Sequence, residues 1–226
     1  MTGVSTPGAL HASQPLLHAG AALDGARPAR AAMVMVHGRG SSAGDIVGLA
    51  EAFGDAGATS GDWAFVAPQA ANGTWYPERF MAPIARNEPW LSSALESVGR
   101  AVAHVEGAGI APDRIVLLGF SQGACLVTEW AARHARRFGG IATLSGGLIG
   151  PDGTPRDYAG AFAGTPALLG CSDRDPHIPL ARVRETAAVL ERMGARVDTR
   201  IYENAPHGVF EDEIRAIVTM MEGVTA

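Results

Sequence analysis

Short apolar runs alternate with longer amphipathic stretches from residue 33 to the end of the chain. The apolar runs are five or six residues long and lie at 33–37, 63–67, 114–119, 140–145, 166–170 and 197–202. Such runs are typical of parallel strands that are covered on both faces. The amphipathic stretches predict helices at 44–55, 89–106, 122–135, 179–193 and 209–222. This alternation predicts an α/β fold, with a mostly parallel central sheet and helices on both faces.

The first third of the chain contains weaker signals. Residues 14–32 hold a short apolar segment and the turn signal Asp24-Gly25, which predict an edge hairpin leading into the first parallel strand. Residues 1–13 are expected to be flexible. Because no repeat or linker interrupts the pattern, we expect residues 1–226 to form a single domain. The longest insertion, residues 68–88, is too short for a cap domain.

Composition excludes several classes of protein. The 226 residues are 47% hydrophobic and carry a net charge of −5, without a cluster of Arg and aromatic residues, so no nucleic-acid partner is expected. No apolar stretch approaches the roughly 18 residues that span a bilayer, and the N-terminus lacks the pattern of a signal peptide. Cys125 and Cys171 do not make a disulfide framework. We expect a cytoplasmic protein without stable membrane insertion, and a homodimer is compatible with the sequence.

The sequence GFSQGA, residues 119–124, directly follows one of the predicted strands. Its spacing places Gly119, Ser121 and Gly123 in a Gly-x-Ser-x-Gly pattern. One interpretation is a sharp strand-to-helix turn that exposes a nucleophilic hydroxyl. The alternative is an ordinary glycine-rich loop, since three fixed positions in five residues occur by chance. The nucleophile interpretation therefore requires a base, an acid and oxyanion donors elsewhere in the chain.

Suitable partners follow two later strands. Ligands of open α/β sheets bind beyond the carboxyl ends of the strands. Asp173 and Asp175 follow the strand at 166–170, and His207 follows the strand at 197–202. The order is Ser, Asp, His, with 54 residues from 121 to 175 and 32 from 175 to 207. This is the order of the α/β-hydrolase triad.

These residue types suit nucleophilic catalysis. A serine hydroxyl needs a base to take its proton, and histidine, with an unperturbed pKa of about 6.5, is suited to that task. A carboxylate on the far ring nitrogen orients the base. Asp173 and Asp175 compete for this role, and we favour Asp175 because Pro176 and Ile178-Pro179 restrain its loop. Asp173 would then order the loop.

The oxyanion donors are expected to be two backbone N–H groups. Gln122 offers one at the start of a helix, and Arg39 offers another in the loop His37-Gly38-Arg39-Gly40. His37 could be a second base, but we expect it to be a structural residue hydrogen-bonded beneath this loop. The remaining histidines lack the spacing of metal ligands, so neither a metal nor a cofactor is expected.

Five segments together resemble one family. HGRGSSAGD, APQAANGTWYP, GFSQGA, DRDPHIP and APHGVF are similar to the phospholipase/carboxylesterase group of α/β hydrolases, which includes the acyl-protein thioesterases. The resemblance covers about residues 33 to 220. It implies Ser121 as nucleophile, Asp175 as acid and His207 as base, and the hydrolysis of carboxylic esters or thioesters through an acyl-enzyme.

Residues 72–95 depart from the thioesterase pattern through an aromatic, proline-rich insertion. Its bulky side chains are predicted to line an acyl pocket: Trp75, Tyr76, Phe80, Met81 and Trp90. The alternative is that they cover the sheet edge as core. Asn87 and Glu88 could reach the site, or Asn87 could cap a helix.

We therefore expect a carboxylesterase for small or medium acyl esters, with a small-molecule ester as its substrate. Lysophospholipase or acyl-protein thioesterase activity on long acyl chains is the alternative, and a non-catalytic ligand-binding protein of the same fold is a third. Transfer of the acyl group to another acceptor would use the same residues as hydrolysis.

Overall fold

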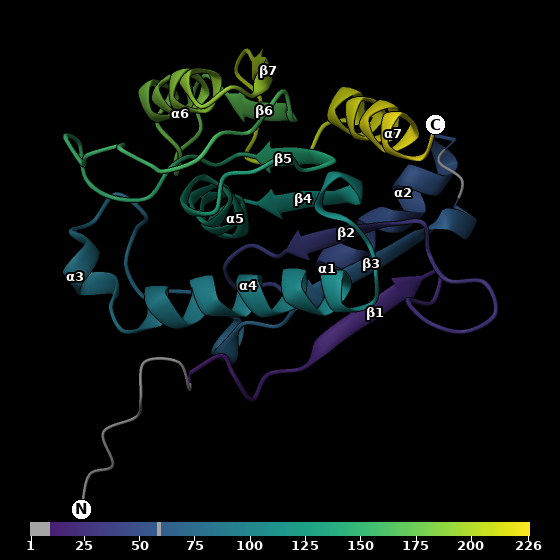
Figure 1. The fold of residues 1–226 in the computed structure, drawn as a ribbon. Helices are drawn as coiled ribbons and strands as arrows, with labels where there is room; N and C mark the ends of the chain where they lie inside the picture. The colour runs from purple at the N-terminus through teal and green to yellow at the C-terminus, as the bar shows by residue number, and fades with distance from the viewer. Residues whose placement is uncertain (1–9, 58–59) are drawn as a thin grey trace, which may run out of the picture.

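A computed structural model describes residues 10–57 and 60–226 of the chain. Seven strands form one sheet in the order β1-β3-β2-β4-β5-β6-β7 (Figure 1). β1 is antiparallel to β3, and all other neighbouring strands are parallel. This mostly parallel sheet with its helices confirms the predicted fold class. Among the described residues, no large cap covers the sheet.

The six predicted apolar runs all form strands. Their bounds are β2 (Ala31–Val36), β3 (Trp63–Pro68), β4 (Ile115–Phe120), β5 (Gly140–Leu144), β6 (Pro166–Ser172) and β7 (Arg196–Tyr202). Every residue of β2, β3 and β5 is buried, which explains why these strands are almost entirely apolar, with Thr143 of β5 as the exception. β4, the strand before GFSQGA, lies in the middle of the sheet.

The helices also follow the predicted pattern. They are α1 (Ala43–Val47), α2 (Leu49–Asp55), α3 (Ile84–Asn87), α4 (Trp90–Gly107), α5 (Gln122–Arg133), α6 (Leu180–Arg192) and α7 (Glu211–Thr225), with short 3-10 turns at Ser60–Asp62, Ala71–Gly73 and Pro112–Arg114. The stretch expected as one helix at 44–55 is divided into α1 and α2 at Gly48.

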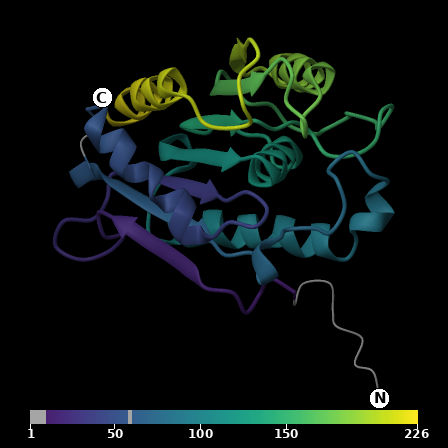
Figure 2. The same cartoon turned by 180° about the vertical axis from the view of Figure 1, so that it is seen from behind.

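The helices cover the two faces of the sheet in two groups. Val34 and Val36 of β2 belong to the core beneath α4, α5 and α6, whereas Met33 and Met35 belong to the core beneath α1, α2 and α7. This division follows from the alternation of side chains along a strand. Figures 1 and 2 show the two layers from opposite sides.

The expected hairpin at residues 14–32 is wrong. β1 (Leu16–Gly20) pairs antiparallel with β3, with Leu16 opposite Pro68 and Gly20 opposite Ala64. β2 has no free edge because β3 and β4 pair with its two sides. The chain therefore adds β1 to the open edge of β3 and returns to the sheet interior before β2.

The expected flexibility of residues 1–13 can be assessed only in part, because residues 1–9 lie outside the described residues. Residues 10–13 form a turn, and the side chain of His11 is buried. Its backbone N–H donates to Ser93 Oγ of α4 at 3.0 Å. For residues 10–13 the expectation is wrong, because a buried histidine attaches this segment to the protein.

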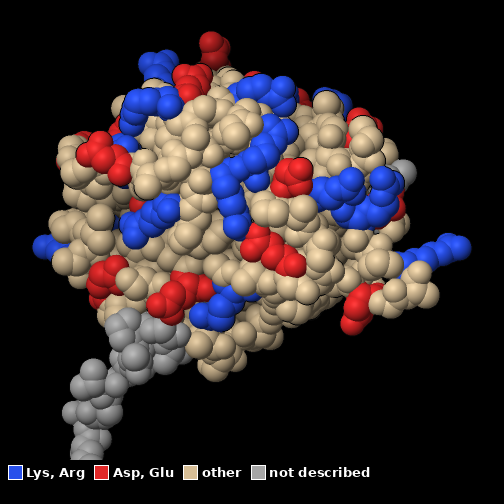
Figure 3. Space-filling model, viewed as in Figure 1, with Lys and Arg blue, Asp and Glu red and all other residues tan. Residues whose placement is uncertain are grey.

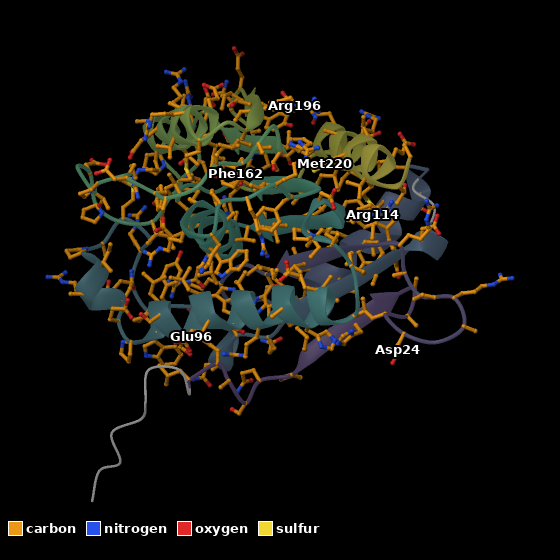
Figure 4. The ribbon with its side chains drawn as sticks, in the orientation of Figure 1. Asp24, Glu96, Arg114, Phe162, Arg196 and Met220 are labelled. Carbon is orange, nitrogen blue, oxygen red and sulfur yellow. The ribbon has the colours of Figure 1, made fainter. Side chains whose placement is uncertain are left out.

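The long connection between β5 and β6 contains little regular structure but is held by buried polar contacts. Arg182 of α6, which is 1% exposed, donates to the carbonyls of Leu148 and Gly150 at 2.8 and 2.7 Å. Gly150 N–H in turn donates to Phe80 O at 2.8 Å. Phe162, near the end of the connection, is fully buried (Figure 4). The connection therefore has a defined conformation beside the loop that holds Phe80.

The charges of the surface are mixed in sign. On the face seen in Figure 3, basic and acidic side chains are interspersed over a largely uncharged surface. Within residues 10–57 and 60–226, no helix has both the length and the apolar character needed to cross a membrane.

Glu213 generates a prediction about stability. Its side chain is fully buried in α7, where Oε2 accepts from Phe210 N–H at 2.8 Å and Oε1 has no hydrogen-bond partner among the described residues. Burial, and secondarily the neighbouring Asp212, raises the pKa of this carboxyl from 4.5 to about 7. Between these values the folded protein keeps a proton that the unfolded chain has lost. Stability should therefore fall as pH rises from about 4.5 to about 7.

Glu213→Gln should remove this dependence. Glutamine can still accept from Phe210 N–H, and it carries no charge. The variant should match the wild type near pH 4.5 and exceed its free energy of unfolding by up to about 3 kcal/mol above pH 7. Urea denaturation across this pH range measures the effect. Parallel pH profiles for the two proteins would contradict the prediction.

Candidate functional site

The GFSQGA motif forms a sharp turn between β4 and α5. Ser121 has φ 55° and ψ −118°, a conformation that a non-glycine residue rarely adopts. A Cβ on Gly119 would overlap Gly123 O, and a Cβ on Gly123 would overlap the carbonyls of Val36 and His37. The spacing Gly-x-Ser-x-Gly therefore has a steric origin, because only glycine fits on either side of this serine.

Three side chains from separate loops meet at this turn. Ser121 Oγ lies 2.9 Å from Nε2 of His207, and Nδ1 of the same ring lies 2.6 Å from Oδ2 of Asp175. His207 follows β7 and Asp175 follows β6, so the carboxyl ends of neighbouring strands bring them together. An ionised Asp175 accepts from Nδ1–H, which leaves Nε2 free to accept the proton of the Ser121 hydroxyl.

The environment of Asp175 maintains its charge. Its side chain is fully buried, and Oδ1 accepts from the backbone N–H groups of His177 and Ile178 at 2.8 and 3.0 Å. Burial opposes ionisation, but the hydrogen bonds from His207 and these two amides outweigh it and lower the pKa of the carboxyl. Asp173 points elsewhere, and its Oδ1 accepts from Asn204 N–H at 2.8 Å.

The two residues predicted to supply oxyanion donors line the same cavity as Ser121. Gln122 begins α5, and Arg39 lies in the loop after β2. Neither backbone N–H donates to an acceptor within the described part of the chain. The next amide in the loop, Gly40 N–H, donates to Gly73 O at 2.7 Å and holds the loop in place.

His37 lies beneath this loop and is fully buried. Ala70 N–H donates to Nε2 at 3.1 Å, so the ring proton is on Nδ1, which donates to Gly38 O at 2.8 Å. Burial lowers the pKa of this imidazole. Both ring nitrogens thus form hydrogen bonds with the backbone of the two adjoining loops.

The cavity beside Ser121 has a volume of about 480 Å³. Its wall combines the reacting groups with apolar side chains: Ser121, His207, Tyr76, Phe80, Phe120 and Ile178. A second cavity of about 470 Å³ lies at the opposite ends of the strands, beside Arg114, Arg196 and Met220 (Figure 4). Volume therefore does not distinguish the two. Only the first brings a hydroxyl and an imidazole together.

The aromatic insertion contributes only part of the wall that we predicted. Tyr76 and Phe80 line the cavity, and Met81 lines a hollow at its mouth next to Phe80. Trp75 and Trp90 are not part of the wall. The Trp75 ring is fully buried and donates from Nε1 to His37 O at 2.8 Å, and Trp90 packs against His11.

Asn87 and Glu88 do not reach the nucleophile. Asn87 is fully buried, where Oδ1 accepts from Glu78 N–H and Nδ2 donates to Arg79 O. It therefore fixes the pocket loop and does not cap a helix. The Glu88 carboxylate accepts from Ser92 N–H and Oγ at the start of α4.

The cavity wall also includes Phe120, His177 and Ile178, which the sequence pattern did not indicate. Phe120 and His177 each place a ring 5.0 Å from that of His207. All three lie within three residues of a predicted triad residue in the chain, and this proximity was the available signal.

The two cysteines are buried and unpaired. Burial raises the pKa of each thiol to about 12, and the nearby Asp175 adds to the effect at Cys171. Both thiols therefore remain protonated near neutral pH and contribute packing. Within residues 10–57 and 60–226, no group of three His, Cys, Asp or Glu side chains is arranged to hold a metal.

Comparison with known proteins agrees with this architecture. The family model for phospholipase/carboxylesterase matches residues 20–224. A solved structure of a phospholipase/carboxylesterase from Dyadobacter fermentans is 40% identical, with a TM-score of 0.85, over 93% of this chain and 97% of that chain.

Curated relatives match over shorter segments. Acyl-protein thioesterase 1 of Saccharomyces cerevisiae is 25% identical over 58% of this chain and 58% of its own length. The protein of the same name from Gibberella zeae is 30% identical over 47% of this chain and 46% of its own length. The chain thus spans about half the length of these two relatives. Because the family model matches most of the residues, the chain belongs to the phospholipase/carboxylesterase family.

Proposed function

We propose that the protein is a serine hydrolase that cleaves small or medium acyl carboxylic esters through an acyl-enzyme. The observation that carries this proposal is the continuous chain of contacts from Ser121 Oγ through His207 to Asp175, at 2.9 and 2.6 Å, beside a partly apolar cavity. The family relationship supports the ester chemistry.

The geometry supports the following reaction. His207 Nε2 takes the hydroxyl proton as Ser121 Oγ attacks the carbonyl carbon of the ester. The Arg39 and Gln122 backbone N–H groups stabilise the negative charge that develops on the carbonyl oxygen. His207 then gives its proton to the leaving alkoxide as the ester bond breaks. Water, deprotonated by the same imidazole, releases the carboxylic acid and restores Ser121.

The size of the cavity supports short or medium acyl groups. Its volume of about 480 Å³ is within the ordinary range for small ligands, roughly 300–1,000 Å³. Phe80 and Tyr76 supply rings on its wall, and Gly150 N–H holds the backbone carbonyl of Phe80 at 2.8 Å. We therefore expect an acyl group of limited length to fill it.

Thioesterase activity on long acyl chains is the second candidate. The observation that favours it is the similarity to proteins named acyl-protein thioesterase 1. The same nucleophile and base would cleave a thioester, so only substrate preference separates the candidates.

Replacement of Ser121 tests the nucleophile. Ser121→Ala should lower kcat for p-nitrophenyl butyrate by about 10³-fold or more, because no other group takes over attack on the carbonyl. The residual rate comes from binding and the oxyanion donors. A fluorophosphonate probe should label the wild type and leave the variant unlabelled. Full activity in a folded variant would exclude the mechanism.

Asp175 and Asp173 provide a matched pair of variants. Asp175→Asn should lower kcat by about 10⁴-fold, because the amide no longer holds the imidazole in the required tautomer or stabilises its charge. Asp173→Asn keeps the oxygen that accepts from Asn204 N–H and should change kcat little. Steady-state kinetics measures both, and comparable losses in the two variants would contradict the assignment.

The substrate proposal is tested by a series of p-nitrophenyl esters from two to sixteen carbons, with matching thioesters. Each methylene that the cavity accommodates should add about 0.8 kcal/mol of binding, so kcat/KM should rise to an early maximum. Phe80→Ala should shift this maximum to longer chains. Trp90→Phe, which lies outside the cavity wall, should not shift it.

A steady rise to sixteen carbons, or a strong preference for thioesters, would favour the second candidate. An unchanged maximum in Phe80→Ala would show that this ring does not limit the acyl group.

A further inference from the structure

The backbone oxygen of Tyr76 lies between the two predicted oxyanion residues. Arg39 Nη2 donates to it at 2.8 Å, and Gln122 Nε2 donates to it at 2.8 Å. Thr74 Oγ1 also donates to this oxygen, at 3.1 Å. Tyr76 itself lines the acyl cavity. One carbonyl of the pocket wall is therefore held by side chains from both loops that are predicted to stabilise the oxyanion.

Arg39 also binds the two residues that follow Tyr76. Its guanidinium donates to three consecutive carbonyls, with Nη2 at 2.8 Å from Tyr76 O and 2.7 Å from Glu78 O, and Nη1 at 2.9 Å from Pro77 O. Hydrogen bonds with a charged donor are shorter and stronger than neutral ones. Within the described part of the chain, no ion pair includes Arg39.

These contacts join two parts of the site that have different tasks. The backbone of Arg39 lies in the loop after β2, whereas residues 76–80 form the wall against which the acyl group would pack. The wall segment lacks a strand or long helix, and the carbonyls of Tyr76, Pro77 and Glu78 accept from the Arg39 side chain. A shift of one segment would move the other through the guanidinium.

We propose that the side chain of Arg39 is a positioning residue that couples the oxyanion loop to the acyl-pocket wall, and thereby sets both the reaction rate and the preferred acyl length. This inference rests on the proposed function for its kinetic consequences. Its structural consequence, restraint of residues 74–80, is independent of that function.

A simpler role for Arg39 would be attraction of anionic groups by its positive charge. Arg79 lies at the same cavity and provides the comparison. Within the described residues, its guanidinium makes one hydrogen bond to the backbone, a long one to Pro176 O at 3.4 Å, and it does not donate to the carbonyls of residues 76–78. Arg39→Met and Arg79→Met therefore remove equal charge from one cavity, but only the first removes the three contacts to the wall.

The kinetic test compares Arg39→Met, Arg39→Lys and Arg79→Met across the p-nitrophenyl ester series. Arg39→Met should lower kcat by about 10- to 100-fold through displacement of the oxyanion loop, and its chain-length maximum should broaden toward longer esters. Arg39→Lys should behave similarly, because one ammonium group cannot reproduce the planar guanidinium that donates to three carbonyls. Arg79→Met removes the same charge without the three contacts to the wall, so it should not reproduce the combined fall in kcat and broadening toward longer esters.

Restoration of both properties in Arg39→Lys, or the same changes in Arg79→Met, would show that charge alone matters and would overturn the inference. An unchanged kcat and chain-length maximum in Arg39→Met would also overturn it. In either case, hydrolysis by the wild type and its loss in Ser121→Ala would leave the proposed function intact.

Hydrogen exchange supplies a measurement that does not require activity. Amides within residues 74–80 should exchange faster in Arg39→Met than in the wild type or Arg79→Met, while amides of β4 and β5 remain protected and show that the fold is retained. If Arg39→Met does not fold, the same comparison is made with Arg39→Lys. Unchanged exchange in residues 74–80 of a folded Arg39 variant would contradict the proposed coupling.

Discussion

The close approach of α5 to the end of β2 controls the arrangement of the site. Gly123 faces the carbonyls of Val36 and His37, and Gly119 faces Gly123 O, so neither position has room for a side chain. This approach allows Ser121 to adopt its positive φ and places the first turn of α5 beside the loop after β2. The amides of Gln122 and Arg39 can then lie at one cavity, although 83 residues separate them in the chain (122 − 39). A looser packing at this point would separate the nucleophile from both donors.

The pocket wall depends on a different kind of restraint. Residues 69–78 run through the protein with little regular structure, and their backbone groups find partners among distant side chains. His37 accepts from Ala70 N–H, His11 accepts from Ala71 N–H, and Gln122 Oε1 accepts from Trp75 N–H at 3.0 Å. Since unpaired buried backbone groups are costly, these side chains specify the path of the loop. The shape of the acyl cavity therefore depends in part on His11 and His37, which do not line it.

Both the sheet and the side chains of Ser121, Asp175 and His207 could be selected from the sequence, because both leave local signals. Buried parallel strands are apolar throughout, and loops that follow them at the same sheet edge come together in space. His207 could be selected in this way. For the acid, the same reasoning left Asp175 and Asp173 as competitors. The choice between the two carboxylates rested on nearby prolines, and the structure places Asp175 beside His207.

Tertiary contacts decide the features that the sequence did not indicate. The partner of β1 depends on which strand has an open edge, and the local pattern before β2 contains no such information. The sequence does not distinguish Trp75 from Phe80, because both are bulky residues of one insertion. The ring of Trp75 nevertheless lies in the core, where Nε1 donates to His37 O, whereas Phe80 lines the cavity. Asn87 likewise has a short polar side chain typical of a cap, but its partners are the backbone of Glu78 and Arg79.

His11 supports the loop that leads to the pocket wall from outside the residues that the family model matches. Its ring donates from Nε2 to Trp75 O at 3.0 Å, whereas the match begins at residue 20. Part of the support for this loop thus comes from a segment outside the matched region. A substitution at His11 would alter the path of the loop while the nucleophile, the base and the sheet stay the same. A comparison restricted to the matched residues leaves this contact out.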